Sequence, residues 1–129
     1  MTVVDADLYF QTHCTRTLLT SPTIEAAIER LRNSGDHDSL FSVTRVFKRY
    51  WTPDGRPVNH DPKVLVRTQD LPPFYEENSN IYVFTRDLIL SRGTRIGERP
   101  ILFEMDPAEA FDIDDEMDFR MAELLLEQA

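Results

Sequence analysis

Strand-like and helix-like segments alternate along this chain, and the alternation limits its fold more than any other feature. Runs rich in apolar and β-branched residues lie at 7–12, 39–46, 81–84 and 100–105. Each is short enough, and apolar enough, to be a buried strand. Segments with helix signals fall between and after these runs. Strands interleaved with helices predict an α/β fold built of layers.

The helix signals are start and stop residues. Ser21 suits the N-cap of a first helix and Pro22 its first turn, while Gly35 is predicted to end this helix in the left-handed conformation. Residues 85–90 predict a short second helix that stops at Gly93. A third helix is predicted near the end of the sequence, with an apolar stripe at Met117, Met121, Leu124 and Leu125.

Composition excludes several function classes. The 129 residues suffice for one domain, 1–129, and the net charge of −9 argues against binding to nucleic acid or to an anionic membrane. No apolar run approaches the ~18 residues that a membrane span needs. The single cysteine, Cys14, cannot form an internal disulfide, so we expect a cytoplasmic protein.

Acidic side chains gather at 111–116, just before the last predicted helix. Asp112 and Asp114 flank Ile113, so a short strand at 111–113 would point both carboxylates to one side. Asp114 or Asp115 is expected to cap the helix. A calcium loop of the EF-hand type is excluded, because its obligatory glycine position holds Met117. Two interpretations stay open from the residues alone: helix capping, and a carboxylate pair that holds Mg²⁺ or Mn²⁺ beside a phosphorylated substrate.

Polar residues elsewhere could line a ligand site. Gln11 lies at the polar end of the first predicted strand, where open α/β sheets bind ligands. The alternative is that Gln11 only caps the loop. An arginine binds carboxylates with two donors, and amides read hydroxyls. The residues that could bind a ligand in this way are Arg67, Gln69, Asn78 and Tyr82. Their alternative role is hydrogen bonding within the loops.

Several segments together carry a resemblance to a known family, and they occur in order over nearly the whole chain. They are 8–13 (LYFQTH), 39–44 (SLFSVT), 67–72 (RTQDLP), 75–82 (YEENSNIY), 95–97 (RIG), 112–114 (DID) and 118–119 (DF). With these segments the chain resembles the cytidylyltransferases that activate acidic sugars, and among them the acylneuraminate cytidylyltransferases (CMP-sialic acid synthetases).

The resemblance implies a reaction and a set of roles. The reaction is the transfer of CMP from CTP to an acidic sugar with release of pyrophosphate. Asp112 and Asp114 would be the catalytic, metal-binding pair for Mg²⁺ or Mn²⁺. The implied substrate-binding residues, which form the acidic-sugar wall, are Gln11, Arg67, Gln69, Asn78 and Tyr82.

The resemblance also implies a partial Rossmann-like nucleotidyltransferase sheet with flanking helices. The family's N-terminal half, which cradles CTP, has no counterpart here, so the chain is expected to be truncated and weakly active or inactive alone. A homodimer, or pairing with the missing half, is implied. After Gln11 the family reads Thr-Asn-Pro-Leu or Thr-Ser-Pro-Leu, whereas residues 15–18 here are TRTL. The alternatives are an enzyme of the 3-deoxy-manno-octulosonate type and a non-catalytic binding or assembly module.

Overall fold

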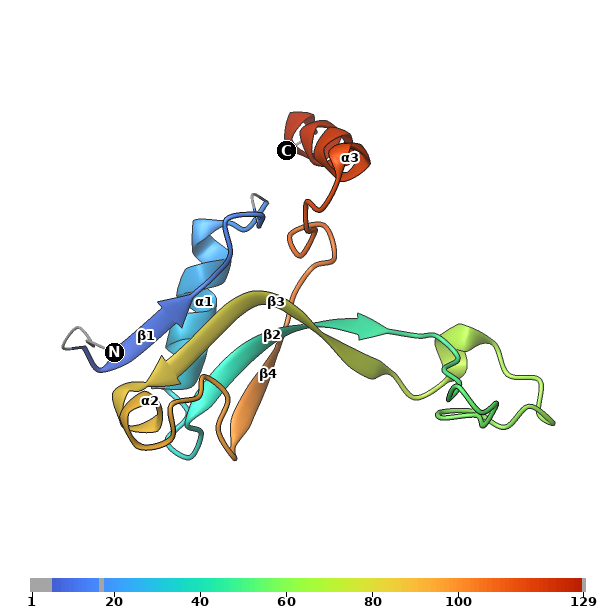
Figure 1. Cartoon of the computed structure of the whole chain (residues 1–129), viewed down its shortest axis with the longest axis horizontal. Coiled ribbons are helices and arrows are strands. Elements are labelled where there is room, and N and C mark those ends of the chain that lie inside the picture. Colours follow the sequence, from blue (N-terminus) through green and yellow to red (C-terminus); the bar gives the residue numbers. More distant parts are fainter. Residues whose placement is uncertain (1–5, 17, 129) are drawn as a thin grey trace. The chain divides into compact units, whose positions relative to one another are not determined.

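A computed structural model describes residues 6–16 and 18–128 of the chain (Figure 1). Thr17, part of the loop at 15–18 that departs from the family pattern, lies outside these described residues. The chain divides into two compact units. The larger contains the described residues up to 44 and from 77 onward, and the smaller contains residues 45–76.

The sheet confirms the α/β prediction. Its strands are β1 (Leu8–Gln11), β2 (Ser39–Val46), β3 (Phe74–Thr85) and β4 (Pro100–Glu104), in the order β1-β3-β2-β4. β1 pairs antiparallel with β3, and β2 pairs parallel with β4, so the sheet is mixed. Three strands match the predicted runs closely. β3 is longer than predicted because it also includes the polar residues 75–80, which carry no apolar signal.

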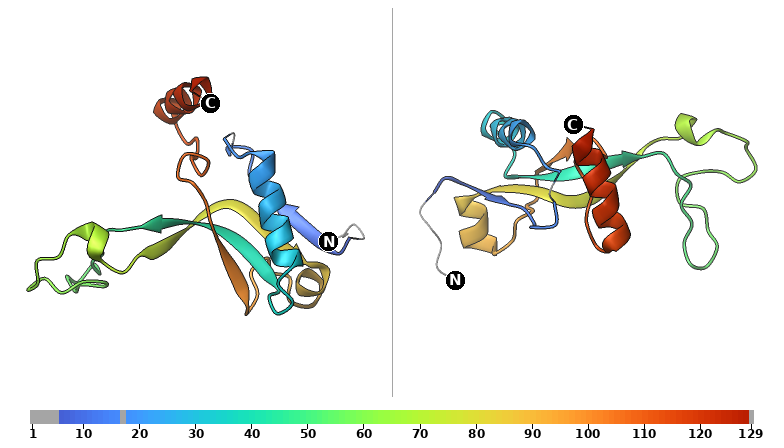
Figure 2. Two further views of the ribbon diagram at one scale, coloured as in Figure 1. Left: turned by 180° about the vertical axis from the view of Figure 1, so that it is seen from behind. Right: turned by 90° about the horizontal axis from the view of Figure 1, so that it is seen from above.

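Helices cover both faces of this sheet in the larger unit (Figures 1 and 2). The first, α1 (Ser21–Arg32), contributes Ala27 and Leu31 to a core cluster with buried residues of β2, β3 and β4. The second, α2 (Arg86–Arg92), buries Leu88 beside Tyr82 and Phe84 in a separate cluster. In an antiparallel or mixed sheet, successive residues face opposite sides, so Tyr82 and Val83 belong to different clusters.

The ends of α1 differ from the prediction, whereas the ends of α2 agree with it. Thr20, in an extended conformation, is the N-cap of α1 in place of Ser21. Asn33 ends α1 in a right-handed conformation and its N–H donates to the carbonyl of Glu29, so no left-handed glycine is needed and the prediction for Gly35 is wrong. In α2, Thr85 accepts the Leu88 N–H and Gly93 adopts φ 65°.

The last helix, α3 (Glu116–Glu127), forms where it was predicted, but most of its apolar stripe is exposed, and Leu125 is half-buried. Asp115 is the N-cap and its Oδ1 accepts the Asp118 N–H at 2.8 Å. Ala122 is the buried residue of the helix. The large apolar side chains that α3 exposes are Met117, Phe119, Met121, Leu124 and Leu126.

The smaller unit holds a hairpin-like turn and one short helix. Trp51 pairs with Pro57 across the turn, and Gly55 there takes φ 84°, which glycine adopts without steric cost. A single 3-10 turn, η1 (Thr68–Asp70), follows. Within the described part of the chain, no helix is long and apolar enough to cross a membrane.

Candidate functional site

The acidic stretch follows β4 and leads into α3 as an irregular loop. Residues 111–114 form no strand, so the prediction of a strand at 111–113 is wrong. The reason is local competition, because aspartate side chains bond the nearby backbone. Asp118 Oδ2 accepts the Asp114 N–H at 3.0 Å, which ties that N–H to the helix instead of to a neighbouring strand.

Asp112 and Asp114 nevertheless come together. Their carboxyl groups lie close enough for each to shift the pKa of the other. A hydrogen bond from Thr15, followed by the positive charge of Arg16, lowers the pKa of Asp112. The negative charge of Asp112 is the main reason that the pKa of Asp114 is raised. The pair therefore contains one strongly acidic carboxyl and one that holds a proton more readily.

Arg16 is the cation of this site. Its Nη2 lies 3.4 Å from Asp112 Oδ2, and its Nη1 donates to the carbonyl of Ala110 at 3.3 Å. The Arg16 side chain is only 10% exposed, and its Nε is buried without a partner among the described residues. Asp112 Oδ1 is also buried and has no partner there. The site thus holds one donor and one acceptor that the described residues leave unsatisfied.

A buried polar network connects this loop to the sheet. The fully buried Asn80 of β3 donates through Nδ2 to the Ala110 carbonyl at 3.2 Å, the same oxygen that Arg16 reaches. Ser42 of β2 accepts the N–H groups of Asn80 and Ile81 through its hydroxyl oxygen, at 3.2 and 2.8 Å. The backbone just before Asp112 is therefore held against the middle of the sheet.

Two of the predicted sugar-wall residues lie inside the protein. Asn78 accepts from the Ser42 hydroxyl at 2.5 Å and donates to Thr44 Oγ1 at 3.0 Å, so both ends of its amide are used. Tyr82 is fully buried and donates through its hydroxyl to Glu77 at 2.6 Å. Burial is the main reason that the pKa of Tyr82 is raised.

A cation also stacks on the ring of Tyr82. The guanidinium carbon of Arg95 lies 3.8 Å from the ring centre, in cation–π geometry. Ser79 supports the same region: it adopts φ 58° within β3, and its Oγ lies 3.1 Å from the Tyr82 hydroxyl oxygen. Arg95 belongs to a segment that the family resemblance included, but sequence reasoning gave it no role.

The other predicted residues are exposed. Gln11 ends β1 directly opposite Tyr82, so the two side chains leave the sheet on the same face. Arg67 and Gln69 belong to the smaller unit, at and on η1. There the Arg67 Nε donates to Asp70 Oδ2 at 3.0 Å, and the Arg67 side chain stays 75% exposed.

Sequence reasoning missed Thr15, Arg16, Ser42, Asn80 and Arg95 as parts of this arrangement. Arg16 and Ala110 are separated by 94 positions, and no spacing pattern joins them. The available signal was that the loop at 15–18 departs from the family pattern by carrying an arginine. A single arginine in a loop is a weak signal, because most such residues are solvated.

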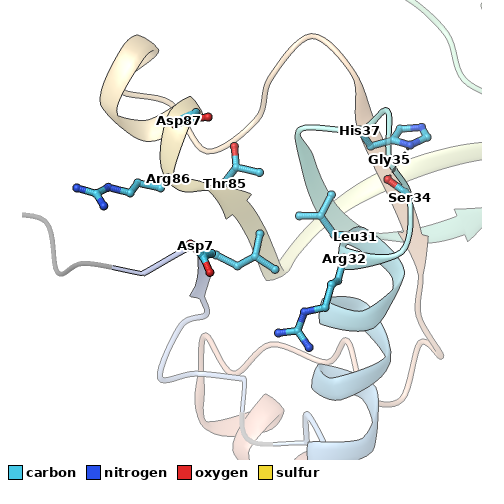
Figure 3. A pocket seen from close by; sticks show the side chains of 10 residues that line it. Asp7, Leu31, Arg32, Ser34, Gly35, His37, Thr85, Arg86 and Asp87 are labelled. Carbon is cyan, nitrogen blue, oxygen red and sulfur yellow. Dashed lines mark hydrogen bonds between the residues drawn. The ribbon is translucent and has the colours of Figure 1, made fainter.

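A cavity of about 820 Å³ lies at another place, at the start of β1 (Figure 3). Its lining comes from the end of α1 and the loop after it, from the start of β1 and the residue before it, from the end of β3 and from the start of α2. The charged residues around it have both signs, Asp7 and Asp87 against Arg32 and Arg86. It contains none of the residues that the sequence analysis singled out for a site, and its mixed charge does not select a class of ligand.

No family model matches the chain, but two bacterial proteins resemble part of it. A protein of Campylobacter coli named post-translational flagellin modification protein B is 36% identical over 75 residues, which are 58% of this chain and 32% of that protein. The CMP-N,N′-diacetyllegionaminic acid synthase of Campylobacter jejuni is 43% identical over 58 residues, 45% of this chain and 25% of the synthase. The matches span less than a third of each relative. They confirm the resemblance to the acylneuraminate cytidylyltransferase family that the motifs indicated.

Proposed function

We propose that this chain, as a relative of the acylneuraminate cytidylyltransferases, forms the acidic-sugar and metal side of an enzyme that makes a CMP-sugar. The oxygen of the sugar's anomeric hydroxyl attacks the α-phosphorus of CTP. The bond from that phosphorus to the bridging oxygen of the β-phosphate breaks, pyrophosphate leaves, and the hydroxyl proton is released. On this proposal the four strands belong to a Rossmann-like nucleotidyltransferase sheet.

The observation that carries the proposal is the closeness of the two carboxyl groups, each of which shifts the pKa of the other. Helix capping needs one acid at the start of α3, and Asp115 fills that role. Asp112 and Asp114 are therefore not required as caps, yet they adjoin each other where like charges repel. Like-charged groups held together in this way occur preferentially at functional sites, and the named synthase among the relatives points to the same reaction class.

The pair fits a magnesium or manganese ion. Asp112 Oδ1 is buried and unpartnered, which leaves a carboxylate oxygen available as a ligand. Mg²⁺ characteristically uses one or two carboxylates and completes its shell with water and substrate phosphates. The described residues contain no cluster of three or more His, Cys, Asp or Glu side chains that could enclose an ion by themselves. When bound, the ion would neutralise charge on the phosphates of CTP.

The remaining residues divide into contacting and supporting groups. Gln11, Arg67 and Gln69 are exposed, so we assign them to direct contact with the hydroxyls and the carboxylate of the sugar. Asn78 and Tyr82 are buried, and their polar atoms are already bonded within the protein. We assign these two to holding β3 in place behind the sugar.

The first test is a Mn²⁺ titration of the full chain followed by calorimetry. The wild-type chain should bind Mn²⁺ weakly, and the double variant Asp112→Asn/Asp114→Asn should lose that binding. Asp115→Asn is the matched control: it removes one negative charge from the same loop, and asparagine caps a helix about as well as aspartate. The control should bind Mn²⁺ as the wild type does. Unchanged binding by the double variant would remove the metal site from the proposal.

The second part of the test concerns the sugar. CMP-N-acetylneuraminate should bind more tightly than CMP-3-deoxy-manno-octulosonate, and Arg67→Gln should weaken its binding. The reverse preference would favour the octulosonate-type enzyme. If the chain binds neither nucleotide, with or without Mn²⁺, the hypothesis of a non-catalytic module would be favoured.

We also propose that the chain associates with a second copy through α3. The helix exposes Met117, Met121 and Leu124, which lie at i, i+4 and i+7 on one stripe. Exposed apolar stripes of this kind usually mark a contact surface.

A further inference from the structure

Arg16 is the cation that lies beside Asp112 of the carboxylate pair. Its Nη2 lies 3.4 Å from Asp112 Oδ2, a distance at which two opposite charges attract directly. It is held there by the bond from Nη1 to the Ala110 carbonyl and by burial, since only 10% of the side chain is exposed. A guanidinium in this position already supplies the pair with a positive charge.

The ion pair between Arg16 and Asp112 leaves hydrogen-bonding atoms of both side chains without partners among the described residues, which a purely structural ion pair would not do. A buried arginine in a stable ion pair normally offers its donors in a fork to two carboxylate oxygens. Here Asp112 Oδ1 and Arg16 Nε are both buried, and neither has a partner among the described residues. The contact between Arg16 and Asp112 therefore leaves a donor and an acceptor unsatisfied, and unsatisfied buried groups lower the stability of the arrangement.

We propose that Arg16 is a resident cation of the carboxylate pair, which a divalent metal ion must displace from Asp112 when it binds. This inference rests on the proposed function, because it assumes that the pair is a metal site. It predicts that Arg16 weakens metal binding to the unliganded protein. The loop at 15–18 would then do more than connect β1 to α1, since it would set the metal affinity of a site formed far along the sequence.

The test compares Mn²⁺ dissociation constants, measured by calorimetry, for the wild type and three variants. Arg16→Gln removes the charge but keeps a polar side chain, and it should bind Mn²⁺ roughly fivefold or more tightly than the wild type. Arg16→Lys keeps the charge on a group that cannot make the same fork, and it should fall between the two. The matched control is Arg120→Gln, which removes an equal charge from an arginine of α3 that is 73% exposed and pairs with Glu116. It should change the constant less than twofold.

A second measurement uses the wild type alone and so does not depend on the folding of a variant. The Nε–H resonance of Arg16 should shift when Mg²⁺ is added, and it should stay in place when NaCl of equal ionic strength is added. Equal Mn²⁺ constants with an unmoved Arg16 resonance would overturn the inference and leave the metal site intact. Weaker binding by Arg16→Gln would also overturn it, because Arg16 would then organise the metal ligands. An absence of Mn²⁺ binding in every variant and in the wild type would instead refute the metal site, and the inference with it.

Discussion

At the scale of single residues, the two carboxyls of the pair have opposite effects on stability. The pKa of Asp112 is lowered, first by the hydrogen bond from Thr15. The contribution of Asp112 to the free energy of unfolding is therefore present above the ordinary carboxyl pKa, and it is lost as the pH falls through the lowered pKa. The pKa of Asp114 is raised, chiefly by the charge of Asp112. The contribution of Asp114 to the free energy of unfolding is present below the ordinary carboxyl pKa, and it is lost as the pH rises through the raised pKa.

This difference predicts opposite shifts for two similar substitutions at pH 7. Asp114→Asn removes a charge that the fold disfavours, so the urea midpoint should rise. Asp112→Asn leaves the nine-tenths buried Arg16 without its carboxylate, so stability should fall by roughly 1–2 kcal/mol. The gain in Asp114→Asn should vanish when the pH is lowered below the ordinary carboxyl range, where Asp114 is already neutral. Shifts in the same direction for both variants would contradict the described pair.

At the scale of elements, the loop between α2 and β4 is fastened to the start of β2 by Asp38. The carboxylate of Asp38 accepts the N–H groups of Glu98 and Arg99 at 3.2 and 3.3 Å. The Gly97 N–H donates to Ser39 Oγ at 3.0 Å, and a Cβ at Gly97 would overlap the Asp38 carboxylate. The loop can approach β2 this closely only because residue 97 has no side chain.

Gly97→Ala should therefore lower the free energy of unfolding by roughly 1–3 kcal/mol, because the carboxylate of Asp38 must move out of its hydrogen bonds. Urea denaturation measures the change. Gly35→Ala is the matched control, since a Cβ there meets no atom within 4 Å and the backbone is not left-handed. The control should be unchanged or up to about 1 kcal/mol more stable. An equal loss in both variants would show that the close approach at Gly97 is not the cause.

The elements also show where sequence reasoning succeeds and where it stops. β2 and β4 were predicted with nearly correct bounds because a buried strand is itself the apolar run. The strand expected at 111–113 failed because neighbouring aspartates bond their own backbone, which an apolar pattern does not reveal. The contact of Arg16 with Asp112 depends on how the segment before α1 and the loop after β4 pack together, so no local pattern could indicate it.

At the scale of the whole molecule, the exposed stripe of α3 predicts self-association that rises with concentration. Replacing Met121 and Leu124 together by glutamine keeps the helix and the net charge but removes apolar surface. Sedimentation equilibrium should then show a monomer where the wild type shows a dimer. Glu123→Gln, which changes an exposed polar residue of the same helix and leaves the apolar stripe intact, should still dimerise. A wild type that stays monomeric at every concentration would rule out the stripe as a contact surface.

The carbonyl of Ala110 has one more consequence. It accepts from the buried amide of Asn80 and from the guanidinium of Arg16, so both of its lone pairs are in use. The backbone just before the two aspartates is thus held in place as the chain folds, and a ligand that binds there does not have to order it. The entropy of such an encounter would be governed by the water that the ligand and the carboxylates release, with little contribution from the backbone.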